Sequence, residues 1–265
     1  MDPIEPIAPQ PSDELWRQIL LENPRAQRNR RRHRRIPSAP RCKSCAAPFG
    51  GLGALIMPLL GHGRWPKNPK YCVGCFQMLE QNHGGAEVEC SLLFADVRGS
   101  TGLAERMSPR DFNRLMGRFR DVAFDVLVSH DAFVDKFVGD EIIGILVPAM
   151  AGPSHPQKAI AAATELLQLT GVSDPSGPWI PVGIGVSTGV AYVGSVGVGP
   201  DTDLTAMGDL VNTTARLAST AAAGEILIMV SPAMDDALVG LERRTLTLRG
   251  KSTTTEVAVL SAPET

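Results

Sequence analysis

The chain has 265 residues and a net charge of −2, with 43% hydrophobic and 20% charged residues. This balance excludes a chain that is disordered throughout, and the length suits one ordinary domain with an extension. The charge is unevenly spread: residues 1–90 carry 13 Lys+Arg and 8 Asp+Glu, a net of +5, whereas residues 91–265 carry 13 and 20, a net of −7. Two chemically different parts therefore join near residue 90.

The N-terminal sequence does not predict export or membrane insertion. The first twenty residues contain acidic residues and several prolines and lack the continuous apolar core of a secretory signal. The longest nearly apolar run, residues 49–61, contains four glycines and Pro58, and it is shorter than the ~20 residues of a membrane-spanning helix. We therefore expect a soluble, cytoplasmic protein.

Residues 1–39 are expected to form a flexible arm rich in proline and arginine. Residues 25–35 contain seven arginines and cannot bury apolar surface, so they are predicted to be solvated. The functional interpretation is binding to an acidic partner, to nucleic acid or to an anionic membrane surface. The alternative is a solubilising linker. No aromatic residues interleave the arginines, so no stacking platform for single-stranded nucleic acid is present in this stretch.

Residues 40–84 contain two C-x-x-C pairs that are separated by 26 residues. The cysteines are Cys42, Cys45, Cys72 and Cys75. Without an export signal, this pattern indicates metal binding before disulfides. The segment is too small for a sufficient core, so a cross-link must supply its order, and four thiolates around Zn²⁺ in a zinc-ribbon-like segment would do so. An iron–sulfur cluster and a redox dithiol are the alternatives. A fifth cysteine, Cys90, begins a strand and is expected to be a buried thiol.

From residue 86 the hydrophobic pattern becomes regular. It predicts a buried strand over 88–96, a helix that starts at Ser108-Pro109, a hairpin over 132–147, a helix over 156–170, one or two strands in 179–196, a helix over 209–222, and strands over 224–230, 243–250 and 254–260. The β-α-β-β-α-β order predicts a ferredoxin-like α+β sandwich over residues 86–262, with one sheet and helices on one face.

Two aspartates are expected to meet in this topology, because the first and third strands are neighbours. Asp96 ends the first strand and Asp140 lies in the following hairpin. Two such carboxylates repel unless a cation fills the space between them, and oxygen ligands with open positions suit Mg²⁺ and substrate phosphates. The pair is typical of two-metal phosphoryl transfer. The backbone N–H groups of Arg98, Gly99, Ser100 and Thr101, at a turn into a short helix, could cradle phosphate oxygens. The alternative is that both aspartates are turn residues only.

Three sequence blocks, FADVRGST, KFVGDEIIGIL and AMGDLVNTTARLAS, resemble in order and spacing the class III nucleotidyl cyclases, the adenylate and guanylate cyclases. The resemblance covers about residues 88–260. It implies that Asp96 and Asp140, helped by the backbone carbonyl of Val97, bind two Mg²⁺ or Mn²⁺ ions. Ser100 stands where many members of the family have phenylalanine, a departure that removes no ligand.

The resemblance also implies roles for residues of the last block and beyond. Asn212 would orient the ribose and Arg216 would stabilise charge on the α-phosphate, and their spacing of four places them on one face of a helix. Arg249 matches the position of a cation for the terminal phosphates, with Lys251 as the second choice.

The choice of base follows from two further positions. Lys136 matches the lysine that donates to adenine N1 in adenylate cyclases, and a lysine has only donors to offer. Thr205 stands where most of these enzymes have aspartate, but it matches a subgroup with threonine. A hydroxyl can accept a hydrogen bond from the 6-amino group of adenine. Because it can also donate, we expect weaker discrimination against GTP.

In this family the metal-binding aspartates come from one subunit and the other site residues from its partner, which implies a head-to-tail homodimer here. We therefore predict an adenylate cyclase that converts ATP to 3′,5′-cyclic AMP and pyrophosphate and carries an N-terminal regulatory segment. The alternatives are a guanylate cyclase, against which Lys136 argues, and a catalytically inactive zinc-bearing protein that binds nucleic acid or regulates. The inactive alternative predicts the loss of at least one site residue, and none is lost.

Overall fold

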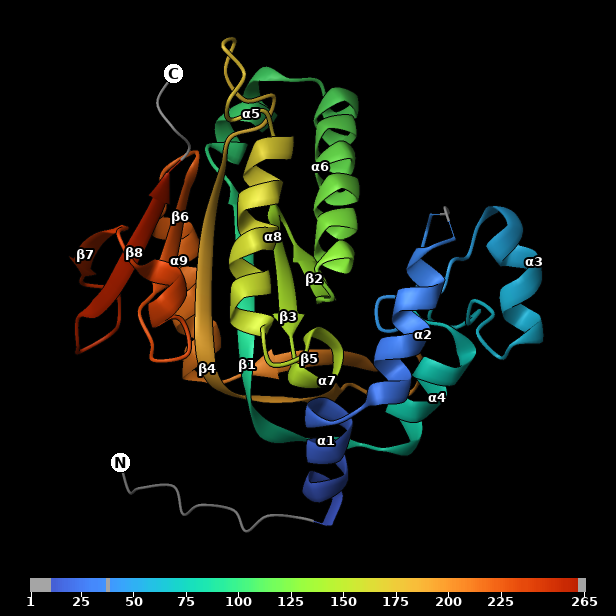
Figure 1. Ribbon diagram of the computed structural model, residues 1–265. Coiled ribbons are helices and arrows are strands. Elements are labelled where there is room, and N and C mark those ends of the chain that lie inside the picture. Colours follow the sequence, from blue (N-terminus) through green and yellow to red (C-terminus); the bar gives the residue numbers. More distant parts are fainter. Residues whose placement is uncertain (1–10, 37–38, 262–265) are drawn as a thin grey trace.

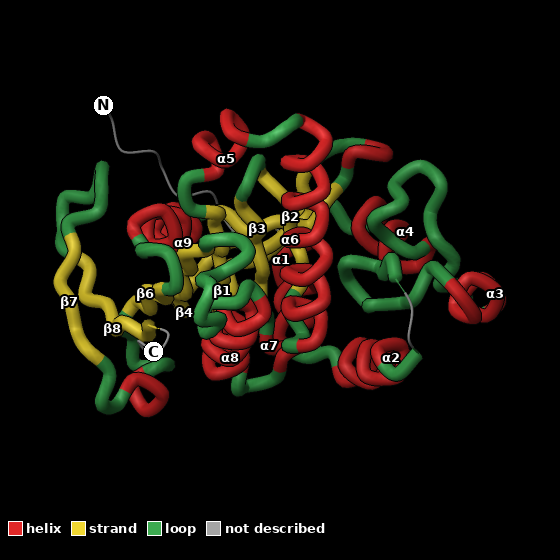
Figure 2. Tube along the Cα trace, turned by 90° about the horizontal axis from the view of Figure 1, so that it is seen from above, coloured by secondary structure: helices red, strands yellow, loops and turns green. Residues whose placement is uncertain are grey.

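The computed structural model describes residues 11–36 and 39–261, and in this part of the chain an eight-stranded mixed sheet is covered by helices (Figures 1 and 2). The helices are α1 Pro11–Leu21, α2 Pro24–Arg34, α3 Gly51–Leu59, α4 Val73–Gln81, α5 Ser100–Arg106, α6 Pro109–Ser129, α7 Pro148–Ala151, α8 His155–Leu169 and α9 Asp209–Thr220. The strands are β1 Gly84–Val97, β2 Phe133–Val138, β3 Glu141–Leu146, β4 Val182–Val196, β5 Asp203–Met207, β6 Glu225–Met229, β7 Glu242–Leu246 and β8 Thr255–Ser261.

The sheet order confirms the predicted neighbourhood of the first and third strands. The strands run β2-β3-β1-β4-β6-β8-β7, and β5 pairs with the far end of β4. Strand β1 is antiparallel to both β3 and β4, whereas β4 and β6 are parallel. In this register Asp96 lies opposite Glu141 of β3 and Gly183 of β4.

Helices α6 and α8 cover one face of the sheet. Phe119 and Leu127 of α6 and Leu166 of α8 are buried against inward-facing residues of β1 such as Leu93. Helix α6 begins as the sequence predicts, because the Ser108 side chain accepts a hydrogen bond from the N–H of Asp111 and Pro109 takes the first helical position. Burying apolar side chains in this layer supplies most of its stability.

The other face is covered as well, which differs from the expected arrangement of helices on one face only. Helix α1, the four-cysteine segment and helix α9 pack there, where Trp16 and Phe76 join Leu92 and Phe94 of β1 in a second buried cluster. The continuous burial of residues 90–95 of β1 explains this, because a strand that is apolar on both faces needs a cover on each.

The arginine-rich segment also differs from the expected solvated arm. It forms α2, whose first turn is capped by the Asn23 side chain, and it buries Arg30 and His33. The Arg30 guanidinium donates to the carbonyls of Ser44 and Ala132. A fully buried arginine is stable only where acceptors meet it, and composition alone does not reveal such acceptors. Five arginines of the segment remain exposed: Arg25, Arg28, Arg31, Arg32 and Arg35.

Candidate functional site

The structure places Asp96 and Asp140 together at one edge of the sheet. Asp96 is the second-last residue of β1. The N–H of the last residue, Val97, donates to the Asp140 carbonyl at 3.3 Å. Gly139 supplies the left-handed backbone, with a φ of 63°, that the β2–β3 turn requires. Strand pairing between β1 and β3 thus brings the backbones of Asp96 and Asp140 to the same edge of the sheet.

Two further charged side chains belong to this edge, and the sequence analysis gave neither of them a role. Glu141 is partly buried, and burial followed by the nearby Asp140 charge raises its pKa to about 7, although Arg98 opposes the shift. Arg98 forms an ion pair with Asp96 and donates to the Ser219 carbonyl at 2.7 Å. Carboxyl groups gathered at one edge are oxygen ligands that a divalent cation could bind, and the Arg98 guanidinium offsets part of their charge. The available signal was their position in the sequence, because Glu141 directly follows Asp140 and Arg98 lies two residues after Asp96.

The predicted phosphate loop lies where β1 ends. Gly99 has a φ of 65° and precedes α5, which begins at Ser100 and includes Thr101. The N–H of Arg98 donates to the Pro181 carbonyl at 2.8 Å and fixes the start of this loop. The loop therefore follows directly from the Asp96 edge of the sheet.

Helix α9 carries the remaining polar site residues. Asn212 is exposed and Arg216 is partly buried, and they lie one turn apart on α9. The turn around Gly250 lies against the Arg216 guanidinium, because a Cβ at Gly250 would be 3.3 Å from Arg216 Nη2. On this turn Arg249 is exposed, whereas Lys251 forms an ion pair with Asp209 at the start of α9.

Lys136 and Thr205, the two residues expected to recognise the base, lie on β2 and β5. The Thr205 hydroxyl is buried and donates to Asp135 Oδ2 at 2.7 Å. Lys136 follows Asp135 in β2, and its side chain lies outside the described part of the structure. The β2–β3 register shifts between Val134 and Phe137. Such a bulge changes the direction of the side chains beside it.

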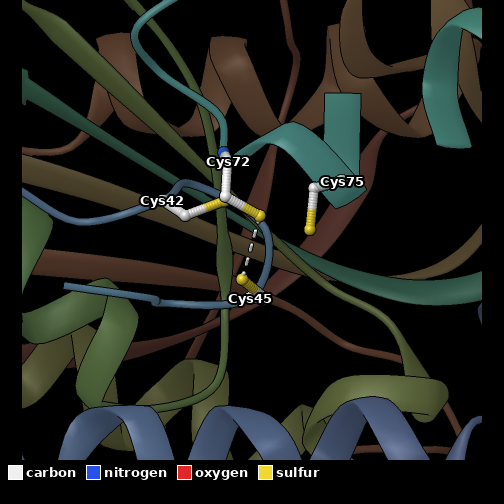
Figure 3. A group of neighbouring side chains, drawn as sticks. All are labelled: Cys42, Cys45, Cys72 and Cys75. Atoms are coloured by element: carbon white, nitrogen blue, oxygen red, sulfur yellow. Dashed lines mark hydrogen bonds between the residues drawn. The ribbon is translucent and has the colours of Figure 1, made fainter. Parts of the chain in front are cut away.

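The four cysteines converge from two segments (Figure 3). Their sulfur atoms all lie within 4.8 Å of one another, and the Sγ atoms of Cys45 and Cys72 are 3.6 Å apart. Tetrahedral Zn²⁺ with Zn–S bonds of about 2.3 Å would place the sulfurs roughly 3.8 Å apart. The Cys72 N–H donates to Cys42 Sγ at 3.3 Å, and His62 Nδ1 lies 3.4 Å from Cys72 Sγ.

The pKa shifts of the cysteines in this cluster also favour a bound cation. Hydrogen bonds from Cys42 and then from Cys45 and Cys75 lower the pKa of Cys72, whereas the hydrogen bond with Cys42 raises the pKa of Cys45. Four thiols this close cannot all become thiolates without a positive charge among them. Cys90 is buried in β1 as expected, and burial raises its pKa to about 12.

The described α-helices range in length from 4 residues in α7 to 21 residues in α6. None of them, in residues 11–36 and 39–261, is both long and apolar enough to cross a membrane.

Comparisons with known proteins agree with this geometry. The family model of the adenylate and guanylate cyclase catalytic domain matches residues 85–258 and so begins after the four-cysteine segment. Adenylate cyclase 1 of Rhizobium meliloti is 29% identical over 148 residues, which are 52% of this chain and 22% of that protein. The chain thus spans less than a third of the length of this curated relative.

Solved structures show the same fold. The guanylyl cyclase Cya2 superposes with a TM-score of 0.59 at 25% identity, covering 66% of this chain and 93% of Cya2. The adenylyl cyclase CyaB from P. aeruginosa gives a TM-score of 0.59 at 22% identity, covering 67% of this chain and 96% of CyaB.

Proposed function

Since the chain belongs to the adenylate and guanylate cyclase catalytic-domain family, we propose that it is an adenylate cyclase that converts ATP to 3′,5′-cyclic AMP and pyrophosphate. The observation that carries the proposal is the edge where Asp96 and Asp140 meet beside the loop that starts at Gly99. This edge offers hard oxygen ligands next to backbone N–H groups, the combination that metal-assisted phosphoryl transfer needs.

The metal-binding role falls to Asp96, Asp140 and the carbonyl of Val97. A pair of Mg²⁺ or Mn²⁺ ions supplies Lewis-acid activation of the ribose 3′-hydroxyl and neutralises the leaving pyrophosphate. Arg98, which is paired with Asp96, would have to release that carboxylate when a cation binds. Glu141, whose pKa burial raises to about 7, places a third carboxyl group at the same edge, and a bound cation would favour its ionised form.

Substrate positioning falls to the phosphate loop and α9. The N–H groups of Gly99, Ser100 and Thr101 would bind phosphate oxygens. Asn212 would orient the ribose, and Arg216 would offset the charge that develops on the α-phosphate. Arg249 would bind the terminal phosphates, because it is exposed on the turn that lies against Arg216, whereas Lys251 already pairs with Asp209.

The preference for ATP rests on Lys136 and Thr205. The only proton of the Thr205 hydroxyl is donated to Asp135, so toward a base this oxygen acts as an acceptor. An acceptor matches the 6-amino group of adenine, whereas the 6-carbonyl of guanine would need a donor. This hydrogen bond therefore favours ATP more strongly than a threonine considered alone. The guanylate cyclase alternative keeps its support from the likeness to Cya2.

The assembly that we propose is a head-to-tail homodimer with two shared sites in the cytoplasm. In the family the metal aspartates and the α9 residues that serve one nucleotide belong to different subunits, and this chain contains both sets. Mixing two inactive variants, Asp140→Ala and Arg216→Ala, should restore roughly a quarter of the activity, because heterodimers keep one intact site. A monomer that retains full specific activity on dilution would contradict this assembly.

The four cysteines are proposed to hold a structural Zn²⁺, with an iron–sulfur cluster as the minor alternative. The spacing of the sulfur atoms and the hydrogen bond from the Cys72 N–H to Cys42 support a closed four-thiolate site. Metal analysis of the purified protein should find about one zinc per chain. Cys42→Ser should lose it.

The enzyme assay tests the main proposal directly. Purified protein is incubated with ATP or GTP and Mn²⁺, and cyclic AMP and cyclic GMP are quantified separately. Asp140→Ala should abolish the product while Asp174→Ala, which changes an exposed loop carboxylate, should not. Product that persists in Asp140→Ala would contradict the metal assignment, and cyclic GMP as the main product would favour the guanylate cyclase alternative.

A further inference from the structure

The four-cysteine module, residues 40–84, contacts the catalytic domain at the two strands that carry the base-recognition residues. Lys43 lies between Cys42 and Cys45 and is buried. Its Nζ donates to the carbonyl of Asp135 on β2 and lies 3.4 Å from Asp203 Oδ2 on β5. These contacts lie one residue from Lys136 and two residues from Thr205.

The second pair of cysteines carries further contacts to β5. Tyr71 directly precedes Cys72, and its hydroxyl donates to Asp203 Oδ1 and accepts from the N–H of Leu204 at 3.1 Å. Asn68 Nδ2 donates to the Thr202 carbonyl at 3.0 Å, and this contact is buried. The module therefore holds the start of β5 through both of its cysteine-bearing segments.

Strands β2 and β5 depend on such side-chain contacts, because they are not neighbours in the hydrogen-bonded sheet. β2 pairs with β3, and β5 pairs with β4. The strands are joined by the hydrogen bond from Thr205 to Asp135 and by Lys43, which touches both. Lys43 stands between the buried residues Cys42 and Cys45, so a metal held by their sulfur atoms would fix the position of Lys43 as well.

We propose that the metal-loaded cysteine module is a brace that holds β5 against β2 and so sets the spacing between Lys136 and Thr205. Lys43 is its positioning residue. The inference rests on the proposed function, in which Lys136 and Thr205 recognise the base of the nucleotide. Loss of the brace moves the groups that contact adenine while the Asp96 edge, built by β1 and β3, keeps its geometry. It therefore raises the KM for ATP and lowers the preference for ATP over GTP, with a smaller effect on kcat.

Lys43→Met tests the brace without touching a metal ligand. It keeps the apolar stem and leaves Asp203 with Lys70 at 3.3 Å and with Tyr71. We expect a full metal content, a KM for ATP raised about tenfold and a lower ATP:GTP ratio. Lys67→Met, an exposed lysine of the same module, is the matched control and should change neither. Unchanged KM and base preference in Lys43→Met would overturn the proposal.

Removal of the metal is the second arm. Cys72→Ser should lose the metal and raise the KM in the same direction, and adding Lys43→Met to it should cause little further change because both act through one contact. Fully additive effects of the two substitutions would contradict a shared mechanism.

Hydrogen exchange gives a readout that does not require activity. The amides of residues 133–138 and 203–207 should exchange faster after metal removal and in Lys43→Met, whereas those of α6 should not change. If these amides remain protected, the brace is wrong. If the wild-type protein makes no cyclic nucleotide, the proposed function fails, and the exchange data still decide whether the brace exists.

A separate surface feature carries a second inference. Helix α3 and the residue that follows it expose an apolar ridge of five residues: Leu52, Leu55, Ile56, Leu59 and Leu60. Leu55 is 72% exposed and Leu59 is 86% exposed. The arginine-bearing helix α2 lies at the same end of the molecule (Figures 1 and 2). A ridge of this kind costs free energy in water and marks a contact surface.

The geometry points to an anionic membrane surface as the occupant of this end. The ridge residues recur at helical spacing, so they can enter the headgroup boundary together, while the exposed arginines of α2 meet the negative lipids. A second copy of the chain would bring arginines against arginines, which disfavours that occupant.

Vesicle flotation tests this surface. Wild-type protein should bind vesicles that contain phosphatidylserine and not vesicles of phosphatidylcholine alone, and salt should weaken binding. Leu55→Gln with Leu59→Gln, and Arg28→Gln with Arg31→Gln, should each lower the affinity at least about tenfold. Absence of binding, or binding that neither variant changes, would overturn the inference. So would a ridge variant that alters only the oligomeric state.

Discussion

Thr205 on β5 donates its hydroxyl proton to Asp135 on β2, with 2.7 Å between Oγ1 and Oδ2. Both residues are buried, and a carboxylate is a stronger acceptor than the Ala206 carbonyl 3.5 Å from the same hydroxyl. Asp135, seventy positions away in the sequence, therefore takes the proton of the Thr205 hydroxyl and leaves its oxygen as an acceptor. Under the proposed role of Thr205 in base recognition, Asp135 is a positioning residue that acts through Thr205.

The first prediction concerns Asp135→Asn. The amide can donate to Thr205, which frees the threonine proton to meet the 6-carbonyl of guanine. We expect the ratio of kcat/KM for ATP to that for GTP to fall roughly tenfold, about 1.4 kcal/mol, in steady-state assays with both nucleotides. Thr205→Val is the comparison, because it removes donor and acceptor together and should weaken ATP use without improving GTP use. An unchanged ratio in Asp135→Asn would show that this hydrogen bond does not select the base.

The second prediction concerns Gly185 of β4, where α9 packs directly on the sheet. A Cβ at this position would lie 2.5 Å from the Thr214 carbonyl and 2.5 Å from the Ala218 N–H nitrogen. Backbone atoms cannot rotate away, so Gly185→Ala must push α9 outward and displace Asn212 and Arg216. We expect kcat to fall at least about tenfold and stability to fall by about 1–3 kcal/mol. Gly117→Ala, in open space on α6, should leave kcat unchanged.

Much of the catalytic edge could be predicted because strand pairing determines it. The apolar strands and the tight hairpin predict that Asp96, near the end of β1, lies close to Asp140 in the turn before the neighbouring strand β3. The exact partners of buried polar groups could not be predicted. From the sequence, Arg30 is expected to be as solvated as its neighbours. In the structure it donates hydrogen bonds to the carbonyls of Ser44 and Ala132, the latter 102 residues away. Long-range acceptors of this kind leave no periodic signal in a sequence.

The third prediction concerns the buried Arg30 of α2. Arg30→Met should lower the free energy of unfolding by about 2–3 kcal/mol, because it removes a buried cation and leaves two carbonyls without their donor. Asp131 keeps Arg34 and Lys158, each at 2.7 Å, which limits the loss. Arg31→Met, one position along on the exposed side of α2, should change stability by less than about 0.5 kcal/mol. Urea unfolding of both variants measures the difference, and equal effects would contradict the docking of α2.

The last prediction is a pH dependence of stability that comes from His155 at the start of α8. The side chain is buried against Ser91, whose hydroxyl lies 2.8 Å from His155 Nδ1, and burial lowers its pKa to about 4. The unfolded chain has the ordinary value of about 6.5, so between these values it binds a proton that the folded chain does not.

Stability should therefore fall as the pH decreases from about 6.5 toward 4, by on the order of 2 kcal/mol after allowance for solvent screening. His155→Asn offers Ser91 a hydrogen bond without titrating in this range. Urea unfolding of both proteins near pH 7 and near pH 5 should show a smaller loss in the variant. If the two proteins lose stability equally, His155 is not the group responsible.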